Sequence, residues 1–259
     1  MRVEPGVRLE DATNEDFIIC GIPRSGTSFL AGALYQPPAS VTVMEPWDGL
    51  RLPPADLMRS LREEIEDGTL RRGRLDVATL QRTGEVRWGR DGEFPHPVDV
   101  RRGFALGVKW PVFWRYLDVL PATRFLLCVR DPIAVIRSFE RTGGRLAQGL
   151  EYDVAFNREL NTELLRASED PSTRRALLYE HIAARLIPHL NDPNVLVVRY
   201  ERWFADSAAL MDEIAKFLGI DLGPGPAAIR SSASRGADPG IAEQVRTHCP
   251  SASGLGYHV

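Results

Sequence analysis

The sequence contains almost no lysine. Of its 32 basic residues only Lys109 and Lys216 are lysines, and all the others are arginines. It also lacks any apolar run of the roughly 20 residues that are needed to cross a bilayer. The first residues are charged and contain no apolar segment of the kind found in signal peptides. We therefore expect a cytoplasmic protein that does not associate with a membrane.

Cysteine is scarce as well. The three cysteines, Cys20, Cys128 and Cys249, form no paired motif, and two of them lie in apolar runs, where small thiols are commonly buried. This pattern favours a reducing compartment and argues against a zinc site, so we expect no bound metal. The formal net charge is −3, which provides no general attraction to nucleic acid, and we expect no such partner. Any anion-binding site must therefore be local.

The 259 residues alternate between short apolar runs and helical patterns, which is typical of βαβ units and a parallel sheet. The expected strands are 17–21, 41–44, 104–108, 124–129 and 195–199. The expected helices are 27–35, 54–66, 112–120, 132–141, 155–167, 173–190 and 207–218. The sequence thus predicts an α/β fold, a single domain over residues 1–259 with a central, mainly parallel β-sheet flanked by helices.

Two segments do not follow this alternation. Residues 66–103, within a stretch at about 50–105, are rich in Arg, Gly and Asp, and residues 223–259 have the composition of an irregular C-terminal segment. In a doubly wound sheet such excursions usually lie beyond the carboxyl ends of the strands, where ligands bind. We expect the stretch at 50–105 to be a substrate-loop insertion. A plain exposed loop is the alternative for any single residue in either segment.

The segment FIICGIPRSGTSFL, residues 17–30, resembles a nucleotide-binding loop. An apolar strand ends at a glycine, four residues follow, and Gly26 precedes a helix, but Thr27 replaces the lysine that ATP-binding loops place there. The backbone N–H groups of Gly26, Thr27 and Ser28 can bind one phosphate at the helix N-terminus, and the hydroxyl of Ser25 can add a hydrogen bond. The missing lysine argues against ATP hydrolysis. A tight turn without a ligand is the alternative.

A second segment, RFLLCVRDPIAVIRSFE, combines a strand end with a helix that begins at a proline. Arg130 ends the strand, and Ser138 lies eight residues later in the helix. This spacing lets the guanidinium and the hydroxyl group converge on one anion, and the planar fork of arginine suits a phosphate. The alternative is a surface ion pair between Arg130 and Asp131.

Three further polar residues follow other strands, namely Glu45 and Asp48 in VMEPWDGL and Lys109 in GVKWP. Because the carboxyl ends of parallel strands meet at one edge of a sheet, we expect these side chains to face the same crevice as the loop. A carboxylate in this crevice can remove a proton from a substrate. We expect Glu45 to be this base and keep Asp48 as the second candidate. For both, loop capping or a salt bridge to an arginine is the alternative.

These segments resemble the sulfotransferases that depend on 3′-phosphoadenosine 5′-phosphosulfate (PAPS). PRSGTSF is similar to the 5′-phosphosulfate loop of that family, RFLLCVRDPIAVIRSFE to its 3′-phosphate segment, and VLVVRYERWFADSAALMDEIAKFLGI to a third family segment. The closing LGY, residues 255–257, is similar to the ends of bacterial members. The segments occur in the family's order and leave about 50–105 and 223–250 unmatched. The resemblance implies a P-loop-NTPase-like sulfotransferase fold and PAPS as co-substrate.

The resemblance also implies roles for single residues. The residues that it places around PAPS are Pro23, Arg24, Ser25, Gly26, Thr27, Ser28, Phe29, Arg130, Ser138 and Tyr200. Arg24 would stabilise the oxygen that bridges phosphorus and sulfur, with an ion pair to Glu45 as the alternative. Lys109 would face the sulfonate. The histidine base that cytosolic animal members place two residues later is replaced by Pro111.

The resulting hypothesis is a bacterial enzyme that transfers a sulfonate group from PAPS to a hydroxyl of a small-molecule acceptor, a natural product or a carbohydrate. PAP is then the product, and a homodimer is a candidate assembly. One alternative is a P-loop kinase, which would need a magnesium-binding aspartate and a loop lysine. Another is a nucleotide-binding protein that has kept the fold and lost the chemistry. A nucleic-acid binder that uses the arginine-rich insertion conflicts with the acidic net charge.

Overall fold

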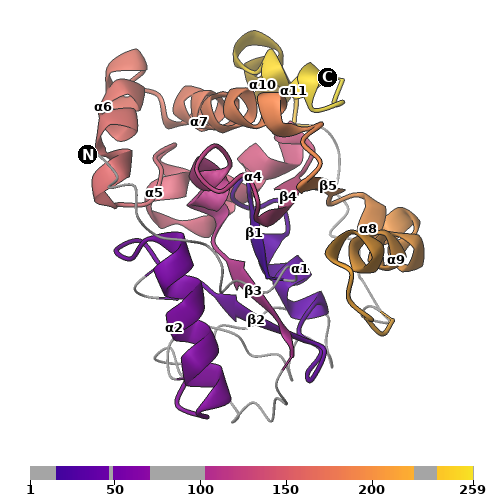
Figure 1. Cartoon of the computed structure of the whole chain (residues 1–259). Coiled ribbons are helices and arrows are strands. Elements are labelled where there is room, and N and C mark those ends of the chain that lie inside the picture. The colour runs from indigo at the N-terminus through magenta and orange to yellow at the C-terminus, as the bar shows by residue number, and fades with distance from the viewer. Residues whose placement is uncertain (1–15, 47–48, 71–102, 225–237, 259) are drawn as a thin grey trace.

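The computed structural model describes residues 16–46, 49–70, 103–224 and 238–258. Its centre is a five-stranded sheet in the order β2-β3-β1-β4-β5 (Figure 1). The strands are β1 Phe17–Gly21, β2 Ser40–Met44, β3 Ala105–Lys109, β4 Arg124–Val129 and β5 Val195–Arg199. Every pairing is parallel, so all five strands end at the same edge. The α/β fold with a parallel central sheet is confirmed.

Ten α-helices and three 3₁₀ helices surround the sheet in the described residues. The α-helices are α1 Thr27–Ala33, α2 Pro54–Glu66, α4 Pro132–Thr142, α5 Gly144–Ala147, α6 Arg158–Ala167, α7 Pro171–Leu186, α8 Arg202–Ala205, α9 Ser207–Leu218, α10 Pro239–His248 and α11 Ser251–Gly254. The 3₁₀ helices are η2 Pro111–Tyr116, η3 Ala155–Asn157 and η4 Ile187–His189. None of these helices is long and apolar enough to cross a membrane.

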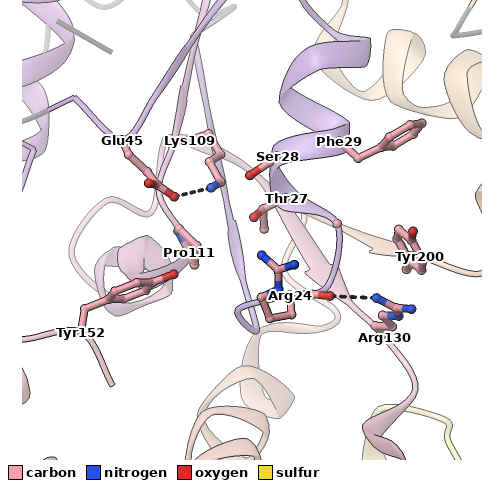
Figure 2. Close-up of a pocket in the computed structure, with 11 residues that line it drawn as sticks. Arg24, Thr27, Ser28, Phe29, Glu45, Lys109, Pro111, Arg130, Tyr152 and Tyr200 are labelled. Atoms are coloured by element: carbon pink, nitrogen blue, oxygen red, sulfur yellow. Dashed lines mark hydrogen bonds and ion pairs between the residues drawn. The ribbon is translucent and has the colours of Figure 1, made fainter. Parts of the chain in front are cut away.

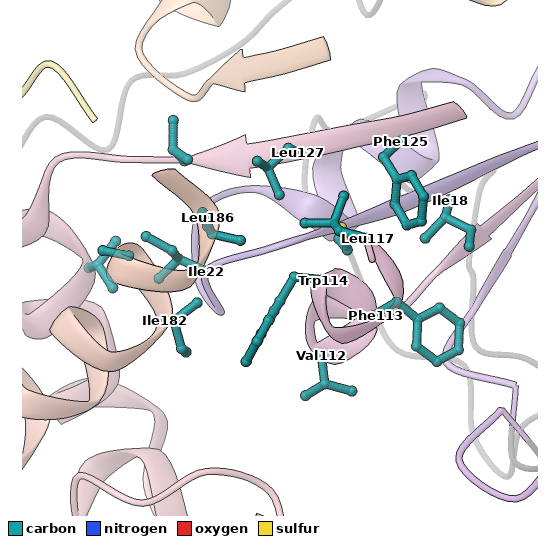
Figure 3. Close-up of a cluster of buried hydrophobic side chains, with 14 of the residues drawn as sticks. Ile18, Ile22, Val112, Phe113, Trp114, Leu117, Phe125, Leu127, Ile182 and Leu186 are labelled. Atoms are coloured by element: carbon teal, nitrogen blue, oxygen red, sulfur yellow. The ribbon is translucent and has the colours of Figure 1, made fainter. Parts of the chain in front are cut away.

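Helices cover both faces of the sheet, and the central strand β1 shows the alternation most clearly. Ile18 and Cys20 belong to a buried cluster with side chains from α2, η2, α4 and α7, whereas Phe17 and Ile19 belong to a second cluster with α1, α8 and α9. Figure 3 shows part of the first cluster, where Trp114 of η2 lies between the sheet and α7. Each fully buried apolar side chain stabilises the fold by roughly 1.5–3 kcal/mol. The two clusters therefore stabilise the sheet from both faces and fix the positions of its strand ends.

Aspartates begin four of the helices. The carboxylates of Asp131, Asp170, Asp206 and Asp238 each accept a hydrogen bond from a backbone N–H in the first turn of α4, α7, α9 or α10. Three of them precede a proline, which suits the first helical position because it has no N–H to satisfy. These caps explain why α4 starts directly behind the carboxyl end of β4.

Several sequence-based boundaries were wrong. Residues 112–120 were expected to form an α-helix, but the structure has the 3₁₀ helix η2, in which Pro111 to Trp114 are all buried. Such a run cannot divide into a buried and an exposed α-helical face. The helix expected at 27–35 ends at Ala33, and the one expected at 173–190 begins at Pro171 and passes into η4 after Leu186. The short helices α5 and α8 were not expected.

The C-terminal segment is not irregular throughout, as 223–259 was expected to be. Helices α10 and α11 occupy most of residues 239–254 and pack against α7 (Figure 1). Ile241, Val245 and Cys249 recur every four residues and are buried, which is the pattern of an amphipathic helix. Within the expected insertion at 50–105, residues 54–66 form α2 as the sequence predicts. Residues 71–102 of that insertion lie outside the described residues.

Candidate functional site

A cavity of about 420 Å³ opens at the carboxyl ends of β1, β3 and β4. It lies where the chain, after filling one side of β1 with β3 and β2, turns to the other side with β4 and β5. Ligands of open α/β sheets bind at such switch points. The residues that line the cavity are Arg24, Gly26, Thr27, Ser28, Phe29, Glu45, Lys109, Pro111, Arg130, Tyr152 and Tyr200 (Figure 2). Sequence reasoning had placed all of them except Pro111 and Tyr152 in the site.

The loop after β1 has the backbone geometry of an anion-binding turn. The N–H of Ile22 donates to the carbonyl of Cys128 at 3.1 Å, and the N–H of Ser25 donates back to the carbonyl of Ile22 at 3.1 Å. Gly26 then precedes α1 with a φ of 87° and has no side chain that could cap the helix. The N–H groups at the start of a helix need partners from outside it. The first turn of α1 therefore offers its donors to a ligand or to solvent.

Gly26 is also packed too closely for any other residue. A Cβ built on it would lie 2.4 Å from Cδ2 of Tyr200, so the Tyr200 ring rests against the backbone of the loop. A positive φ adds a second reason, since only glycine adopts it without strain. The predicted loop thus depends on Tyr200, a residue 174 positions later in the chain.

Two residues other than glycine have a positive φ in the described part of the chain, Arg24 at 69° and Glu45 at 46°. Both line the cavity. The left-handed region costs an ordinary residue about 1–2 kcal/mol. Strained backbone of this kind tends to occur at functional sites, where the surrounding structure maintains it. The strain therefore coincides with two of the residues that the sequence indicated as catalytic.

Arg24 and Ser138 are in contact across 114 residues of sequence. Nε of Arg24 donates to Oγ of Ser138 at 3.0 Å. Nη1 of Arg130 donates to the main-chain carbonyl of Arg24 at 3.2 Å, as Figure 2 shows. The two candidate anion subsites, the loop after β1 and the strand end of β4, therefore share a hydrogen-bonded boundary. The side chain of Arg24 thus contacts Ser138, and not Glu45 as in the alternative considered from the sequence.

Aromatic rings form the wall next to Arg130. Its guanidinium carbon lies 4.2 Å from the centroid of the Tyr200 ring, the geometry of a cation–π contact. Phe29 of α1 meets Trp203 edge-on at a centroid distance of 4.9 Å, and Tyr200 meets Phe204 in the same way at 5.3 Å. Phe29 and Tyr200 both reach the cavity. They can present ring faces or edges to a flat ligand.

Lys109 and Glu45 form an ion pair inside the cavity. The distance from Nζ of Lys109 to Oε1 of Glu45 is 2.6 Å, and the exposed fractions of the two side chains are 2% and 18%. The N–H of Glu45 also donates to the carbonyl of Lys109 at 2.8 Å, which joins the ends of β2 and β3. Attraction between opposite charges at this distance holds the two side chains together. The pair therefore presents a carboxylate to the cavity on the side opposite Arg130 (Figure 2).

Sequence reasoning missed Tyr152, which has no motif around it. Its ring lies beside Pro111 in the cavity wall (Figure 2), and Asn157 donates to its main-chain carbonyl at 2.9 Å. Burial, followed by the charges of Glu45 and Glu151, raises the pKa of the Tyr152 phenol, so the hydroxyl stays protonated.

Glu151, the neighbour of Tyr152, is buried, and burial raises the pKa of its carboxyl from 4.5 to about 7. One of its oxygens, Oε1, accepts a hydrogen bond from the N–H of Tyr152 at 3.0 Å. The sequence gives only a weak indication of such a residue, because it does not show that a glutamate next to a helical segment is buried.

Three of the sequence-based candidates do not line the cavity. Pro23 and Ser25 belong to the loop after β1 but are buried, and Ser138 contacts the site through Arg24. The hydroxyl oxygen of Ser25 has no hydrogen-bond partner in the described structure. Asp48, the second candidate base, lies outside the described residues. Among the residues that are described, no cluster of three or more His, Cys, Asp or Glu side chains is arranged to hold a metal ion.

The family model described as "Sulfotransferase family" matches residues 16–224 of the chain. This range contains all the strands in the described residues and every residue that lines the cavity. None of the curated proteins with which the chain was compared matches it.

Among solved structures, the chain resembles a sulfotransferase from Alicyclobacillus acidocaldarius, with 19% identity, a TM-score of 0.52 and coverage of 94% of this chain and 95% of that one. It also resembles the sulfotransferase domain of the Synechococcus PCC 7002 olefin synthase, with 17% identity, a TM-score of 0.50 and coverage of 97% and 98%. A sulfotransferase domain of the curacin biosynthetic pathway is similar at 14% identity, with a TM-score of 0.51 and coverage of 94% and 98%. At these identities the likeness concerns the fold.

Proposed function

The chain belongs to the sulfotransferase family, and we propose that it transfers a sulfonate group from PAPS to a hydroxyl of a small-molecule acceptor. One observation carries the proposal. Arg24 in the loop after β1 and Arg130 at the end of β4 are joined by a hydrogen bond of 3.2 Å, so two cationic subsites lie side by side in one cavity. PAPS is a nucleotide with a phosphosulfate at its 5′ end and a phosphate at its 3′ position, and it needs both.

The 5′ end of PAPS suits the loop after β1. Gly26, Thr27 and Ser28, at the start of α1, line the cavity, and the hydroxyl of Ser25 is buried without a hydrogen-bond partner in the described structure. A buried hydroxyl without a partner is unfavourable, and a phosphate oxygen would supply one. These features support binding of the 5′-phosphosulfate here.

The 3′-phosphate suits Arg130 and Ser138. The Tyr200 ring holds the guanidinium of Arg130 from one side at 4.2 Å, and arginine can bind a phosphate with two parallel hydrogen bonds. The Ser138 hydroxyl is within reach of the same subsite through its bond to Arg24. The edges and faces of Phe29 and Tyr200 would contact the adenine base.

The reaction that this arrangement supports is an in-line transfer. The acceptor oxygen forms a bond to sulfur while the bond between sulfur and the bridging oxygen breaks, and PAP leaves with the electron pair. Negative charge grows on that bridging oxygen, so a nearby guanidinium stabilises the transition state; Arg24 takes this role. Loss of one such donor typically lowers the rate by about 10²–10³-fold. As in phosphoryl transfer, most of the catalysis lies in positioning and electrostatics.

Glu45 is the residue that accepts the acceptor's proton. Its Oε1 is engaged by Lys109 at 2.6 Å, and a carboxylate has a second oxygen that can accept a proton. Lys109 holds this carboxylate at the cavity and contributes positive charge next to the sulfonate. The apolar wall of Pro111 and the ring of Tyr152 suit the carbon skeleton of a natural product or the face of a sugar ring. These are the two acceptor classes we propose.

Thermal unfolding with matched concentrations of PAP, ADP and magnesium-ATP tests the proposal. A ligand that binds only the folded state stabilises it by about 2.7 kcal/mol at a hundred times its dissociation constant. We expect the midpoint to rise far more with PAP than with the other two nucleotides. A rise with magnesium-ATP alone would instead identify a kinase-type loop. Strong binding of PAP without any transfer from PAPS to a panel of phenols, alcohols and sugars would indicate a nucleotide-binding protein that lacks the chemistry.

A further inference from the structure

The carboxylate of Glu201 connects two parts of the chain that are far apart in sequence. Its Oε1 accepts a hydrogen bond from the backbone N–H of Asp131 at 2.9 Å, and its Oε2 accepts one from the hydroxyl of Tyr257 at 2.9 Å. Asp131 directly follows Arg130, and Tyr257 belongs to the C-terminal LGY. One side chain thus links the end of the chain to the strand end that carries Arg130.

The bond to Asp131 continues the pairing between β4 and β5 by one step. The N–H of Tyr200 donates to the carbonyl of Val129 at 2.9 Å, and this is the last backbone bond between the two segments. Beyond it, the Glu201 side chain takes the place of a backbone carbonyl. The direction of the backbone at Arg130 therefore depends on where the Glu201 carboxylate lies.

The C-terminal segment is anchored firmly enough to position that carboxylate. Leu255 is buried, and its carbonyl accepts a hydrogen bond from the guanidinium of Arg199. The same guanidinium lies 5.4 Å from the centroid of the Tyr257 ring. Gly256 has a φ of 80°, and a Cβ on it would lie 3.0 Å from the Arg199 guanidinium, so this turn requires glycine. The LGY segment is therefore a fixed turn folded over the end of β5.

We propose that Tyr257 is a positioning residue for the 3′-phosphate subsite: through Glu201 it holds the backbone at Asp131, and with it the guanidinium of Arg130, in the orientation that binds the phosphate. The inference rests on the function proposed above. Other contacts of Arg130 agree with it, because Tyr179 donates to its carbonyl at 3.4 Å and the Tyr200 ring covers its guanidinium. Glu201, Tyr179 and Tyr200, which also hold the backbone or side chain at Arg130 and Asp131, lie within the family-model match, whereas Tyr257 lies outside it.

The test compares PAP with 5′-AMP, which differs from PAP by the 3′-phosphate alone. The ratio of their dissociation constants, measured by calorimetric titration, reports the contribution of that phosphate. Tyr257→Phe removes one hydroxyl and changes no charge at pH 7. We expect it to weaken PAP binding by about three- to tenfold, the equivalent of one hydrogen bond, and to leave AMP binding unchanged. Gly256→Ala strains the same turn without altering charge and should change the ratio in the same direction.

Ser253→Ala is the matched control, because its hydroxyl donates to the carbonyl of Pro250 at 2.9 Å in the same C-terminal region and has no contact with Glu201. It should leave the PAP-to-AMP ratio as it is. If Tyr257→Phe lowers the unfolding temperature but leaves the ratio unchanged, the hydroxyl has a merely structural role and the inference is overturned. If the unaltered chain itself does not prefer PAP to AMP, it is the proposed function that fails, and this inference falls with it.

Discussion

The ammonium nitrogen of Lys109 lies 2.6 Å from Oε1 of Glu45, in the cavity where Lys109 ends β3 and Glu45 directly follows the neighbouring strand β2. Glu45 adopts its positive φ of 46° at the point where β2 ends, and the strained turn directs its carboxylate toward the lysine. A salt bridge, a backbone hydrogen bond and an unfavourable dihedral angle thus meet at one residue. This combination makes Glu45 the first residue to alter.

We expect Glu45→Gln to abolish most of the turnover while leaving PAP affinity unchanged. The amide keeps an oxygen for Lys109 but cannot take up a proton, and a general base usually contributes about 10²–10⁴-fold to the rate. The measurement is the rate of PAP formation from PAPS with the acceptor panel. Glu163→Gln, on the exposed side of α6, is the matched control and should behave as the unaltered chain. Full activity of Glu45→Gln would show that another group is the general base, with Asp48 the next candidate.

Arg130→Ala should weaken PAP binding by about 10–100-fold, because a hydrogen bond to a charged group such as the 3′-phosphate is worth about 1.5–3 kcal/mol. The affinity for AMP, which has no 3′-phosphate, should fall much less. Titration calorimetry with both nucleotides measures the difference. Arg141→Ala, at the exposed end of α4, removes the same charge without touching the cavity. Equal losses in the two variants would mean that only the general positive charge matters.

Gly26→Ala should disrupt the loop after β1. A methyl group would lie 2.4 Å from the Tyr200 ring and would have to adopt a φ of 87°, so we expect a loss of stability of about 1–3 kcal/mol and weaker PAP binding. Urea unfolding and titration measure the two effects. Gly68→Ala separates them, because Gly68 has a φ of 66° with no atom within 4 Å of the added Cβ. Gly68→Ala should therefore lower stability through backbone strain alone and leave PAP binding unchanged. Normal PAP binding by Gly26→Ala would contradict the close packing of the Tyr200 ring against Gly26.

Glu151→Gln should change how stability depends on pH. Burial raises the pKa of this carboxyl from 4.5 to about 7, so between these values the folded state binds more protons than the unfolded state. Its contribution to stability is therefore fully present below about pH 4.5 and is lost as the pH rises through about 7. The amide never ionises. Above pH 7 the free energy of unfolding of the variant should therefore be about 3 kcal/mol higher than that of the unaltered chain, and this difference should shrink toward pH 4.5.

Urea unfolding between pH 4.5 and 8 measures this difference directly. Other titrating groups, such as His181, whose pKa burial lowers to about 4, act on both chains and cancel in the comparison. Glu163→Gln again serves as the exposed control. A constant difference between Glu151→Gln and the unaltered chain across this range would show that Glu151 does not titrate with a raised pKa.

The strands were predictable because each is a short apolar run with its own local signal. All five match to within one residue at each end, and β1, β4 and β5 have the expected bounds. Helices α5 and α8 have four residues each, too few to show a period. Helix α10 did carry signals, namely Asp238 before a proline and buried residues every four positions, but the Gly- and Pro-rich composition of the preceding stretch concealed them.

The site was predictable as a set of residues and not as a set of contacts. Motif spacing indicated Arg24, Ser138 and Arg130 as anion ligands, yet nothing in the sequence shows that the first donates to the second across 114 residues. The same holds for Glu45 and Lys109, which are 64 positions apart. Such contacts are set by strand order, and strand order is a property of the whole sheet. Tyr152 depends on a loop conformation that no local pattern encodes.

The ring of Tyr200 has a consequence for selectivity among nucleotides. It rests on the backbone of Gly26 with one edge and supports the guanidinium of Arg130 at 4.2 Å, so a single rigid six-membered ring contacts both the loop after β1 and Arg130. A flexible side chain in this place would let the distance between the loop after β1 and Arg130 adjust to different ligands. The rigid ring keeps that distance constant, so we expect the site to select nucleotides by the spacing of their two anionic groups. Isomers that carry the same charges at other positions, such as the 2′,5′-bisphosphate, would present the second phosphate at the wrong interval.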